Sequence, residues 1–371
     1  MFEIDNALRA LVALDGSDLH LKAGSPPLGR IDGELGPLLP QASSLEGADT
    51  NAALHAILLD PGRLEEFARD NEVDFSYEIE GVARFRVNAF RQRGHVSIVC
   101  RAIPHQIRTI EELSLPPVIG DLAEEERGII LLTGTTGSGK STTLAAMINQ
   151  INERYARHIV TIEDPIEFLH RDKRSIINQR EVGTDTQSFK RALRRVLRQD
   201  PDVILVGEMR DEETVETALS AAETGHLVLS TVHTVDAAES INRMLDFFPP
   251  HQHQQVRSMI AGTLKGVVSQ RLVPGADGGR VAACEVLRMT GRVRDLIVDH
   301  TQTGRLGEVI ADGAYYGMQT FDQALFTHVK SGLVTVEDAL RAASSPHDFK
   351  LLLAADGRRG TTMEDVAAVR G

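Results

Sequence analysis

The sequence has no tryptophan and only two cysteines, and aromatic residues make up 4% of its 371 residues. Cys100 and Cys284 are far apart and nothing resembles a zinc-binding C-x-x-C pair, so a reduced, cytoplasmic setting fits this cysteine content. No window approaches the roughly 18 consecutive apolar residues of a membrane span. The first residues, with Glu3 and Asp5, also lack the basic start of a secretory signal. The sequence therefore predicts neither a zinc element nor a membrane helix.

The sequence also has fewer basic than acidic side chains. The formal charge of −13 argues against wholesale binding of nucleic acid, which needs a basic surface to replace phosphate counterions. With 42% hydrophobic and 25% charged residues, the composition is that of an ordinary globular protein. A chain of 371 residues is too long for one ordinary core and suggests two domains.

The pattern along the chain changes near residue 104. Residues 1–104 predict a mixed α/β domain, with short alternating strands, a helix in "PGRLEEFARDN" and strand turns at Glu80-Gly81 and Arg93-Gly94. A proline-bounded linker is expected over 105–117. The order of these signals predicts a first domain of its own.

Residues 118–353 have a different rhythm, in which apolar strands alternate with amphipathic helices. "GIILLT", "HIVTI", "DVILVG" and "HLVLST" suit a parallel sheet that helices cover on both faces. Asp211 is expected to cap one helix that stops at Gly225, and Asp236 with Glu239 predicts a capping box on the next. Beyond about Gly262 the chain is expected to be mostly helical, and 354–371 to be a loosely attached tail.

The stretch "GTTGSGKST" carries the strongest chemical signal. It matches G-x-x-x-x-G-K-[ST], follows an apolar strand and opens a helix, which is the context that a phosphate-binding loop requires. Backbone N–H groups and the helix N-terminus would hold phosphate oxygens. Lys140 would reach the β- and γ-phosphates, and the Ser141 hydroxyl could ligate Mg²⁺. A glycine-rich surface turn is the alternative, and both spacing and context disfavour it. The expected nucleotide-binding residues are Gly134, Thr135, Thr136, Gly137, Ser138, Gly139, Lys140, Ser141 and Thr142.

Two acidic stretches follow later strands. "TIEDPIEF" holds Glu163, Asp164 and Glu167 at the end of a strand, where ligands bind in open α/β sheets. Glu163 could orient or deprotonate the attacking water there, with solvated loop acids as the alternative. "ILVGEMRD" has the form of a Walker B strand, but glycine stands at 207 in place of the usual aspartate. Glu208 is then the acid available to Mg²⁺ or its waters.

Two histidines bracket the strand "LVLSTV". At about 3.3 Å per residue, seven steps separate His226 from His233 by roughly 20 Å, so one metal ion cannot bind both. His233 would leave the sheet beside the phosphates and is a candidate γ-phosphate contact. His226 is expected to be an interface or structural residue.

Arginines gather in the first domain. Alternation puts Arg84 and Arg86 on one strand face, where solvated side chains are the simpler explanation. The alternative is that some act as arginine fingers on a nucleotide held by a neighbouring subunit.

Together, the Walker A loop, the acidic box, the unusual Walker B strand and the histidine box resemble the secretion-ATPase superfamily, in particular the type IV pilus retraction ATPases. The resemblance covers most of the chain. It implies a PAS-like N-terminal α/β domain, then a RecA-like P-loop ATPase domain with a helical C-terminal region. ATP and Mg²⁺ are the implied ligands, with nucleotide between domains of a homohexameric ring. That ring would lie at the cytoplasmic face of the inner membrane, under the pilus platform protein.

The resemblance also assigns roles to residues. Lys140 and Ser141 match the phosphate and Mg²⁺ residues, Glu163 the catalytic carboxylate, and Glu208 the Walker B acid. His226 and His233 match the histidine box. Arg86 and Arg101 match the arginine fingers best, with Arg91 and Arg93 behind them.

The subclass depends on two further features. The tetracysteine element and extra N-terminal domains of assembly and secretion members are missing, which favours retraction. "RVRDLIVD" keeps Arg294, Leu296 and Ile297 of a retraction motif but has Val298 where the later arginine stands. An accessory retraction ATPase therefore remains open, and a paralogous retraction ATPase could also be a partner. A pilus-assembly or secretion ATPase, a DNA-uptake motor and a non-motor nucleotide switch are further alternatives.

Overall fold

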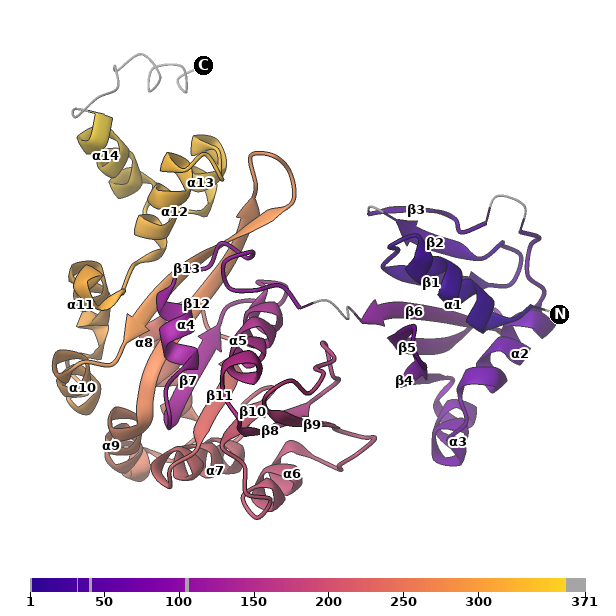
Figure 1. The fold of residues 1–371 in the computed structure, drawn as a ribbon, viewed down its shortest axis with the longest axis horizontal. Coiled ribbons are helices and arrows are strands. Elements are labelled where there is room, and N and C mark those ends of the chain that lie inside the picture. The colour runs from indigo at the N-terminus through magenta and orange to yellow at the C-terminus, as the bar shows by residue number, and fades with distance from the viewer. Residues whose placement is uncertain (1, 32, 40–41, 104–106, 358–371) are drawn as a thin grey trace. The chain divides into compact units, whose positions relative to one another are not determined.

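The computed structural model describes residues 2–31, 33–39, 42–103 and 107–357 (Figure 1). They fall into two compact units, one of residues up to 106 with 167–169, and one of residues 107–166 with those from 170 onward. The described part of the predicted linker, from Ile107, belongs to the second unit. Ile110 and Leu115 are buried in that unit's core. This segment is therefore packed, and residues 105 and 106 lie outside the described part.

In its described residues, the first unit is one antiparallel sheet with three helices. The strand order is β3-β2-β1-β6-β5-β4. The strands are β1 (Asp18–Lys22), β2 (Leu28–Ile31), β3 (Glu34–Pro37), β4 (Glu72–Ile79), β5 (Ala83–Gln92) and β6 (His95–Ile103). The helices are α1 (Ile4–Ala13), α2 (Gly47–Ile57) and α3 (Pro61–Asp70). The predicted mixed α/β character is confirmed.

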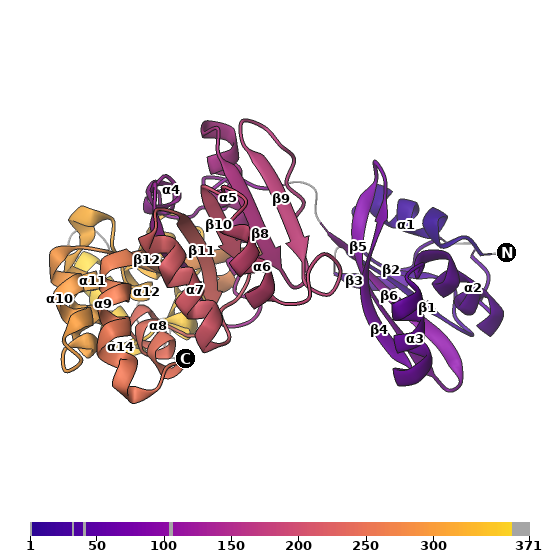
Figure 2. The same cartoon turned by 90° about the horizontal axis from the view of Figure 1, so that it is seen from below.

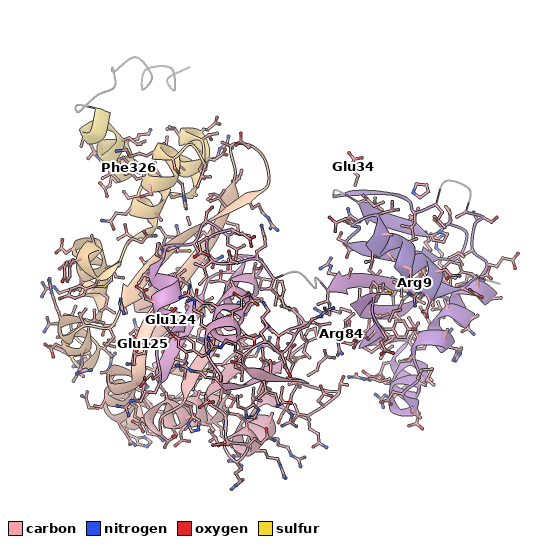
Figure 3. The ribbon with its side chains drawn as sticks, viewed as in Figure 1. Arg9, Glu34, Arg84, Glu124, Glu125 and Phe326 are labelled. Atoms are coloured by element: carbon pink, nitrogen blue, oxygen red, sulfur yellow. The ribbon has the colours of Figure 1, made fainter. Side chains whose placement is uncertain are left out.

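Residue alternation gives this sheet one buried face. On β5 the side chains of Phe85 and Val87 are fully buried, and Arg86 between them is exposed. The predicted turn between β5 and β6 forms at Arg93-Gly94, where both residues have positive φ, 50° and 81°. The three helices pack on the apolar face, and the other face carries the charged side chains of β1, β5 and β6. Figure 3 labels Arg84, one of these, on β5.

The second unit is built on a seven-stranded sheet in the order β13-β12-β7-β11-β10-β8-β9 (Figures 1 and 2). Its strands are β7 (Gly128–Thr133), β8 (His158–Glu163), β9 (Ile176–Glu181), β10 (Val203–Val206), β11 (Leu227–Val232), β12 (Leu264–Pro274) and β13 (Arg280–Arg288). Neighbouring strands are parallel except for the antiparallel pair β12 and β13. The predicted parallel α/β sheet is confirmed.

Helices cover both faces of this sheet. They are α4 (Val118–Ala123), α5 (Lys140–Arg154), α6 (Phe189–Val196), α7 (Glu212–Glu223), α8 (Ala237–Asp246), α9 (His253–Thr263), α10 (Gly291–Val298), α11 (Leu306–Asp312), α12 (Phe321–Lys330), α13 (Val336–Ala342) and α14 (Pro346–Gly357). Short 3-10 turns lie at Pro250–Gln252, Thr303–Arg305 and Ala314–Tyr316. Alternate residues of β7 divide between two cores. Ile129 and Leu131 join the core of α6 to α10, and Ile130 and Leu132 join that of α4 and α5.

Two acidic residues after α4 tie that short helix to its neighbours (Figure 3). Glu124 accepts a hydrogen bond from Gln150 and pairs with Arg154, both on α5. Glu125 pairs with Lys265 on β12 at 2.9 Å. Within the described ranges, no helix is long and apolar enough to cross a membrane.

The helix signals are confirmed in part. Asp211 caps α7 by accepting from the Thr214 N–H at 2.9 Å, and Gly225 follows the helix with φ of 111°. Asp236 caps α8 through the Glu239 N–H at 2.8 Å. The predicted capping box is wrong in its second half, because the Glu239 carboxylate accepts from the Val235 N–H and not from that of Asp236.

Two other expectations are wrong. The chain beyond Gly262 first forms the long strands β12 and β13 before it becomes helical. β12 runs beside β7 in the buried sheet, where neighbouring strands supply the pairing that short-range patterns do not reveal. The predicted tail also starts too early, since α14 continues to Gly357. Residues 358–371 lie outside the described part of the chain.

Candidate functional site

Four neighbouring strands end at one edge of the large sheet, and a predicted site residue lies at or just after the end of each. β7 leads into Gly134 and β11 into His233. β10 leads through Gly207 to Glu208, and β8 ends at Glu163. The register aligns these ends, with Thr133 opposite Val232 and Ile162 opposite Val206. Because all four strands are parallel, their carboxyl ends form one ligand-facing edge.

The loop at 134–139 has a backbone that only glycine adopts easily. Gly134, Gly137 and Gly139 have φ values of 139°, 79° and 90°. A Cβ on Gly134 would lie 2.4 Å from the Gln270 carbonyl oxygen, and one on Gly139 would lie 2.8 Å from the Gln270 Nε2. The loop is thus pressed against β12, and it opens the first turn of α5.

The polar groups of this loop fit a phosphate chain. Lys140 is 8% exposed and its Nζ donates to the carbonyl oxygens of Gly134 and Thr135, at 2.8 and 3.0 Å. The buried Ser138 Oγ has no hydrogen-bond partner among the described residues. Ser141 and Thr142 are half-buried in the first turn of α5. A curled loop with a central ammonium and an unsatisfied hydroxyl is suited to phosphate oxygens, and Ser141 supplies a hydroxyl of the type that ligates Mg²⁺ beside them.

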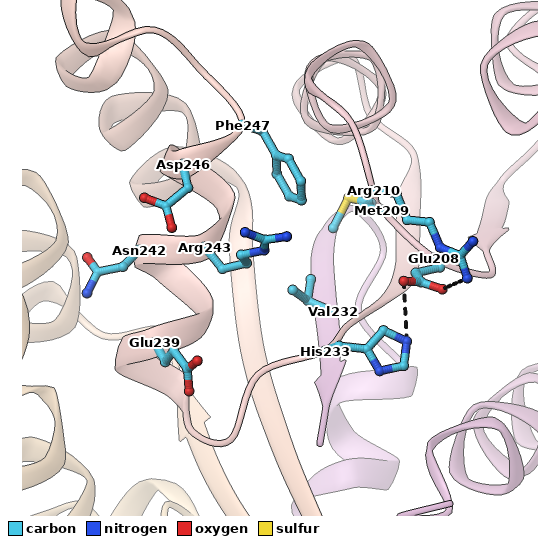
Figure 4. A pocket seen from close by; sticks show the side chains of 10 residues that line it. All are labelled: Glu208, Met209, Arg210, Val232, His233, Glu239, Asn242, Arg243, Asp246 and Phe247. Carbon is cyan, nitrogen blue, oxygen red and sulfur yellow. Dashed lines mark ion pairs between the residues drawn. The ribbon is translucent and has the colours of Figure 1, made fainter. Parts of the chain in front are cut away.

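Glu208, Arg210 and His233 form a polar cluster (Figure 4). Arg210 Nη2 lies 2.6 Å from Glu208 Oε2, and His233 Nε2 lies 3.3 Å from Glu208 Oε1. Burial acts to raise the pKa of Glu208, but the Arg210 hydrogen bond and the charges of His233 and Arg210 outweigh it, so the pKa lies below its usual value. Glu208 is therefore ionised and held between two donors.

A cleft of about 570 Å³ joins this cluster to the glycine loop. Its walls include Thr135 and Thr136 of the loop, together with Glu208, Arg210 and His233. A second recess of about 540 Å³ shares these three residues of the cluster and continues along α8, past Arg243 (Figure 4). The predicted phosphate loop, Walker B acid and second histidine therefore line one connected space.

The Glu163 carboxylate is oriented by its own strand and by β9. Its Oε1 accepts from Thr161 Oγ1 at 2.7 Å and from Gln179 Nε2 at 3.1 Å. Asp164 and Glu167 are exposed in the segment that follows β8. The Glu163 carboxylate is thus held in place at the strand end.

The glycine at position 207 has a steric cause. A Cβ there would lie 3.1 Å from the Ile162 carbonyl oxygen, which already accepts the Gly207 N–H at 2.8 Å. A side chain at this position would require its neighbours on β8 to shift by a few tenths of an ångström. The acid of this strand therefore comes one residue later.

The structure places the two histidines at opposite ends of β11. His226 precedes the strand, where its Nδ1 lies 2.9 Å from the Ala221 carbonyl oxygen and its own carbonyl accepts from Gly128 N–H. His233 follows the strand at the ligand-facing edge. His226 thus joins α7 to the far edge of the sheet and is remote from the glycine loop.

The proposed arginine fingers lie together on the charged face of the first unit. Arg86 and Arg101 are direct cross-strand partners on β5 and β6, and both are exposed. Asp18, which is 3% exposed, pairs with Arg101 Nε at 2.7 Å. Burial acts to raise the pKa of Asp18, but hydrogen bonds from Ser17 and Arg101 hold it below its usual value. The Asp18 carboxylate is therefore charged and fixes the Arg101 side chain at its Nε.

The 292–299 motif divides into core and surface. Leu296 and Ile297 are buried where α10 packs on α9, so they stabilise the fold. Arg294 is exposed, and its Nε donates to the Ala261 carbonyl of α9 at 3.1 Å. Val298, at the position that departs from the motif, is 36% exposed.

Sequence reasoning missed three residues of these sites. Arg210 stands two residues after the Walker B acid, and this short spacing was the available signal. Gln270 holds α5 through Thr143, whose hydroxyl donates to Gln270 Oε1 at 2.9 Å, but it lies on a strand expected to be helical. Asp18 had no local signal, because 83 residues separate it from Arg101.

Comparisons with known proteins agree with this arrangement. Residues 69–341 match the model of the family described as Type II/IV secretion system protein. The chain is 47% identical over 334 residues to the type IV pilus retraction ATPase PilT of Pseudomonas aeruginosa, covering 90% of this chain and 96% of that protein. It is 42% identical over 352 residues to the type IV pilus ATPase PilU of the same species, covering 95% and 91%.

A solved structure extends the likeness to the fold. The crystal structure of the pilus retraction motor PilT with bound ADP superposes with a TM-score of 0.86 at 44% identity, over 94% of this chain and 99% of that one. That neighbour binds a nucleotide on the same fold.

Proposed function

Since the chain belongs to the Type II/IV secretion system protein family, we propose that it is a motor ATPase that hydrolyses ATP to retract type IV pili. The working form is a homohexameric ring. It acts at the cytoplasmic face of the inner membrane, on the platform protein of the pilus machine. The relatives that are named for retraction and for twitching motility support this proposal.

The observation that carries the proposal is the single edge at which the glycine loop, Glu163, Glu208 and His233 meet. The loop N–H groups and Lys140 bind the phosphates. Ser141 and Glu208 would hold Mg²⁺, the latter partly through water, and the ion would neutralise phosphate charge. Glu163 orients the attacking water and accepts its proton, which is the function of a fixed carboxylate at this position.

His233 and Arg210 complete the site on the Glu208 side. Both donate toward Glu208, so a γ-phosphate that enters the cleft meets His233 at its edge. Loss of that phosphate changes the charge that the cluster faces. We propose that this cluster responds to the loss of the γ-phosphate and transmits it, since it lies between the glycine loop and α8.

Arg86 and Arg101 supply the charge that one subunit gives to its neighbour's nucleotide. Their exposure and the fixed Nε of Arg101 support this role. Closure of a first unit over the neighbouring site would couple ATP binding to movement, and hydrolysis would reopen it. Sequential closure around the ring would withdraw pilin subunits.

Turnover and binding of the purified protein test the enzymatic part. Lys140→Ala is expected to weaken ATP binding, and Glu163→Gln to retain binding while lowering turnover by about 10²- to 10⁴-fold. Unchanged phosphate release from both variants would refute the proposed site. Light scattering with and without ATP measures the ring, and a stable monomer with negligible turnover would favour a nucleotide switch instead.

Deletion of the gene in its own host tests the direction of the motor. Loss of retraction predicts many surface pili and no twitching. Bald cells would instead assign the chain to pilus assembly.

An accessory role in retraction is the second candidate. The valine at 298 favours it, although the 42% identity to PilU is below the 47% identity to PilT. An accessory ATPase predicts that a Lys140→Ala strain still twitches when a paralogous retraction ATPase is intact.

A further inference from the structure

A buried row of polar side chains crosses three strands beneath α8. Ser269 on β12 is the register partner of both Thr133 on β7 and Glu285 on β13. Thr133 Oγ1 donates to Ser269 Oγ at 2.9 Å. Thr133 and Ser269 are fully buried, and Glu285 is 8% exposed. The row begins at the residue before the glycine loop and ends at a carboxyl group that no step above uses.

Glu285 reaches the start of α8. Its Oε1 accepts the backbone N–H of Ala237, the first residue of that helix, at 2.9 Å. Asp236 satisfies a different donor of the same turn, the Glu239 N–H. Glu285 therefore acts as a cap from another element, which fixes α8 to β13.

The connection from α8 back to His233 is short and stiff. Three residues, 234–236, join His233 to Ala237. The Thr234 and Ser240 hydroxyls lie 2.7 Å apart, and Ser240 Oγ donates to the Asp236 carbonyl oxygen. A shift of the Ala237 N–H would therefore be passed to His233, whose ring lies 3.3 Å from Glu208 Oε1.

Burial makes a carboxyl group at position 285 unfavourable in free energy, which is unexpected for a residue with a merely structural role. Burial, with a smaller effect of Asp236, raises the pKa of Glu285 to about 7, while the Ala237 N–H and Arg271 oppose the rise. These charged neighbours come from the start of α8 and from β12. An apolar residue would avoid this burial of a carboxyl group but would leave the Ala237 donor without an acceptor.

We propose that Glu285 is a positioning residue, which sets the place of His233 against Glu208 by accepting the Ala237 N–H at the start of α8. The inference rests on the proposed function only for its effect on ATP turnover. The acceptor, and not the charge, is what the arrangement requires. Glutamine can supply that acceptor, methionine of similar length cannot, and aspartate is one methylene too short to reach.

The first test observes His233 directly in the full-length protein. ¹³C-histidine labelling gives a ring resonance that His233→Ala assigns by its loss. We expect Glu285→Met and Glu285→Asp to move this resonance and Glu285→Gln to leave it in place. Cys284→Ala, a buried truncation on the opposite face of β13, is the matched control and should also leave it in place.

Turnover gives the second readout. Glu285→Met and Glu285→Asp are expected to lower kcat by about tenfold, the effect of one unpaired buried donor, with little change in KM for ATP. Glu285→Gln should retain kcat within about twofold, as should Cys284→Ala. A residue that only stabilised the fold would lower thermal stability and would leave kcat of the folded fraction unchanged.

The third test removes the donor, the Ala237 N–H. Ala237→Pro deletes the N–H at the first helical position, where proline is tolerated, and Asp236 before it is already extended. This variant should reproduce the Glu285→Met effects, and the double variant should be no worse than either single one. Additive losses, an unmoved His233 resonance in Glu285→Met, or equal loss in Glu285→Gln would overturn the inference. Absence of ATP turnover in the unmodified protein would instead refute the proposed function, and the resonance would still decide on Glu285.

Discussion

Arg86 and Arg101 lie directly opposite each other on β5 and β6, and the buried Asp18 forms an ion pair with the Nε of Arg101. Two guanidinium groups on adjacent strands would repel each other if neither had an acidic neighbour. Asp18 offsets one of the charges. The contact is made at Nε, and the Arg101 side chain is 71% exposed, so an incoming anion can reach it.

If Arg101 serves a neighbouring subunit, its loss can be complemented by mixing. Arg101→Ala should lower turnover by about 10³-fold or more while ATP still binds. Rings mixed from Arg101→Ala and Lys140→Ala subunits should hydrolyse ATP faster than either variant alone, because some neighbours then combine an intact loop with an intact arginine. Steady-state phosphate release across mixing ratios measures this. Activity that falls linearly between the two variants would show that the arginine does not act in trans.

The two histidines should respond differently to substitution. His233→Ala removes a group from the ligand-facing cleft and should lower kcat by about 10- to 100-fold with unchanged thermal stability. His226→Ala removes the bond to the Ala221 carbonyl at the far edge, so it should cost about 1 kcal/mol of unfolding free energy and leave kcat nearly intact. Phosphate release and urea unfolding separate the two effects. Equal loss of kcat from both, with assembly unchanged, would contradict this division.

The ionisation of Glu285 should appear in the pH dependence of stability. Its pKa is raised from 4.5 to about 7 in the folded chain, so its contribution is fully present below pH 4.5 and is lost as pH rises through 7. Glu285→Gln cannot ionise. It should therefore gain stability relative to the unmodified chain between about pH 5 and 8, on the order of 2–3 kcal/mol at the upper end. Urea unfolding at several pH values checks this, and a gap that does not change with pH would count against a buried titrating carboxyl.

Substitution of Gly139 separates backbone strain from steric contact. Gly139→Ala places a Cβ 2.8 Å from Gln270 Nε2 and forces alanine to a φ of 90°. Nucleotide affinity should fall by about tenfold or more, since strain of this kind costs about 1–3 kcal/mol. Adding Gln270→Ala relieves the contact but not the strain, so it should restore only part of the affinity. Fluorescent nucleotide titration measures both steps, and full restoration would mean that φ at 139 carries no cost.

Local patterns predicted the parts of this molecule that local chemistry determines. The glycine loop, the strand that precedes it and the Asp211 cap each depend on residues within a few positions of one another. β12 pairs with β7, more than a hundred residues earlier, so its place in the sheet has no local signal, and β13 joins the sheet only through β12. Asp18 contacts Arg101, and Glu285 contacts Ala237, between segments that are far apart in the sequence. The local sequence around Asp18 or Glu285 does not predict either contact.

Gly207 has a consequence for how such a motor can diversify. Because β8 passes so close, a side chain at 207 would crowd the Ile162 carbonyl oxygen, and the acid lies one residue later, in the loop that leads to α7. Glu208 and Arg210 of that loop lie outside the paired residues of β8, β10 and β11, so their side chains can be exchanged without changing that pairing. Substitutions in this loop can therefore change the side of the site that faces the γ-phosphate while the sheet that holds the glycine loop stays the same. The residues that respond to hydrolysis can thus evolve separately from the sheet.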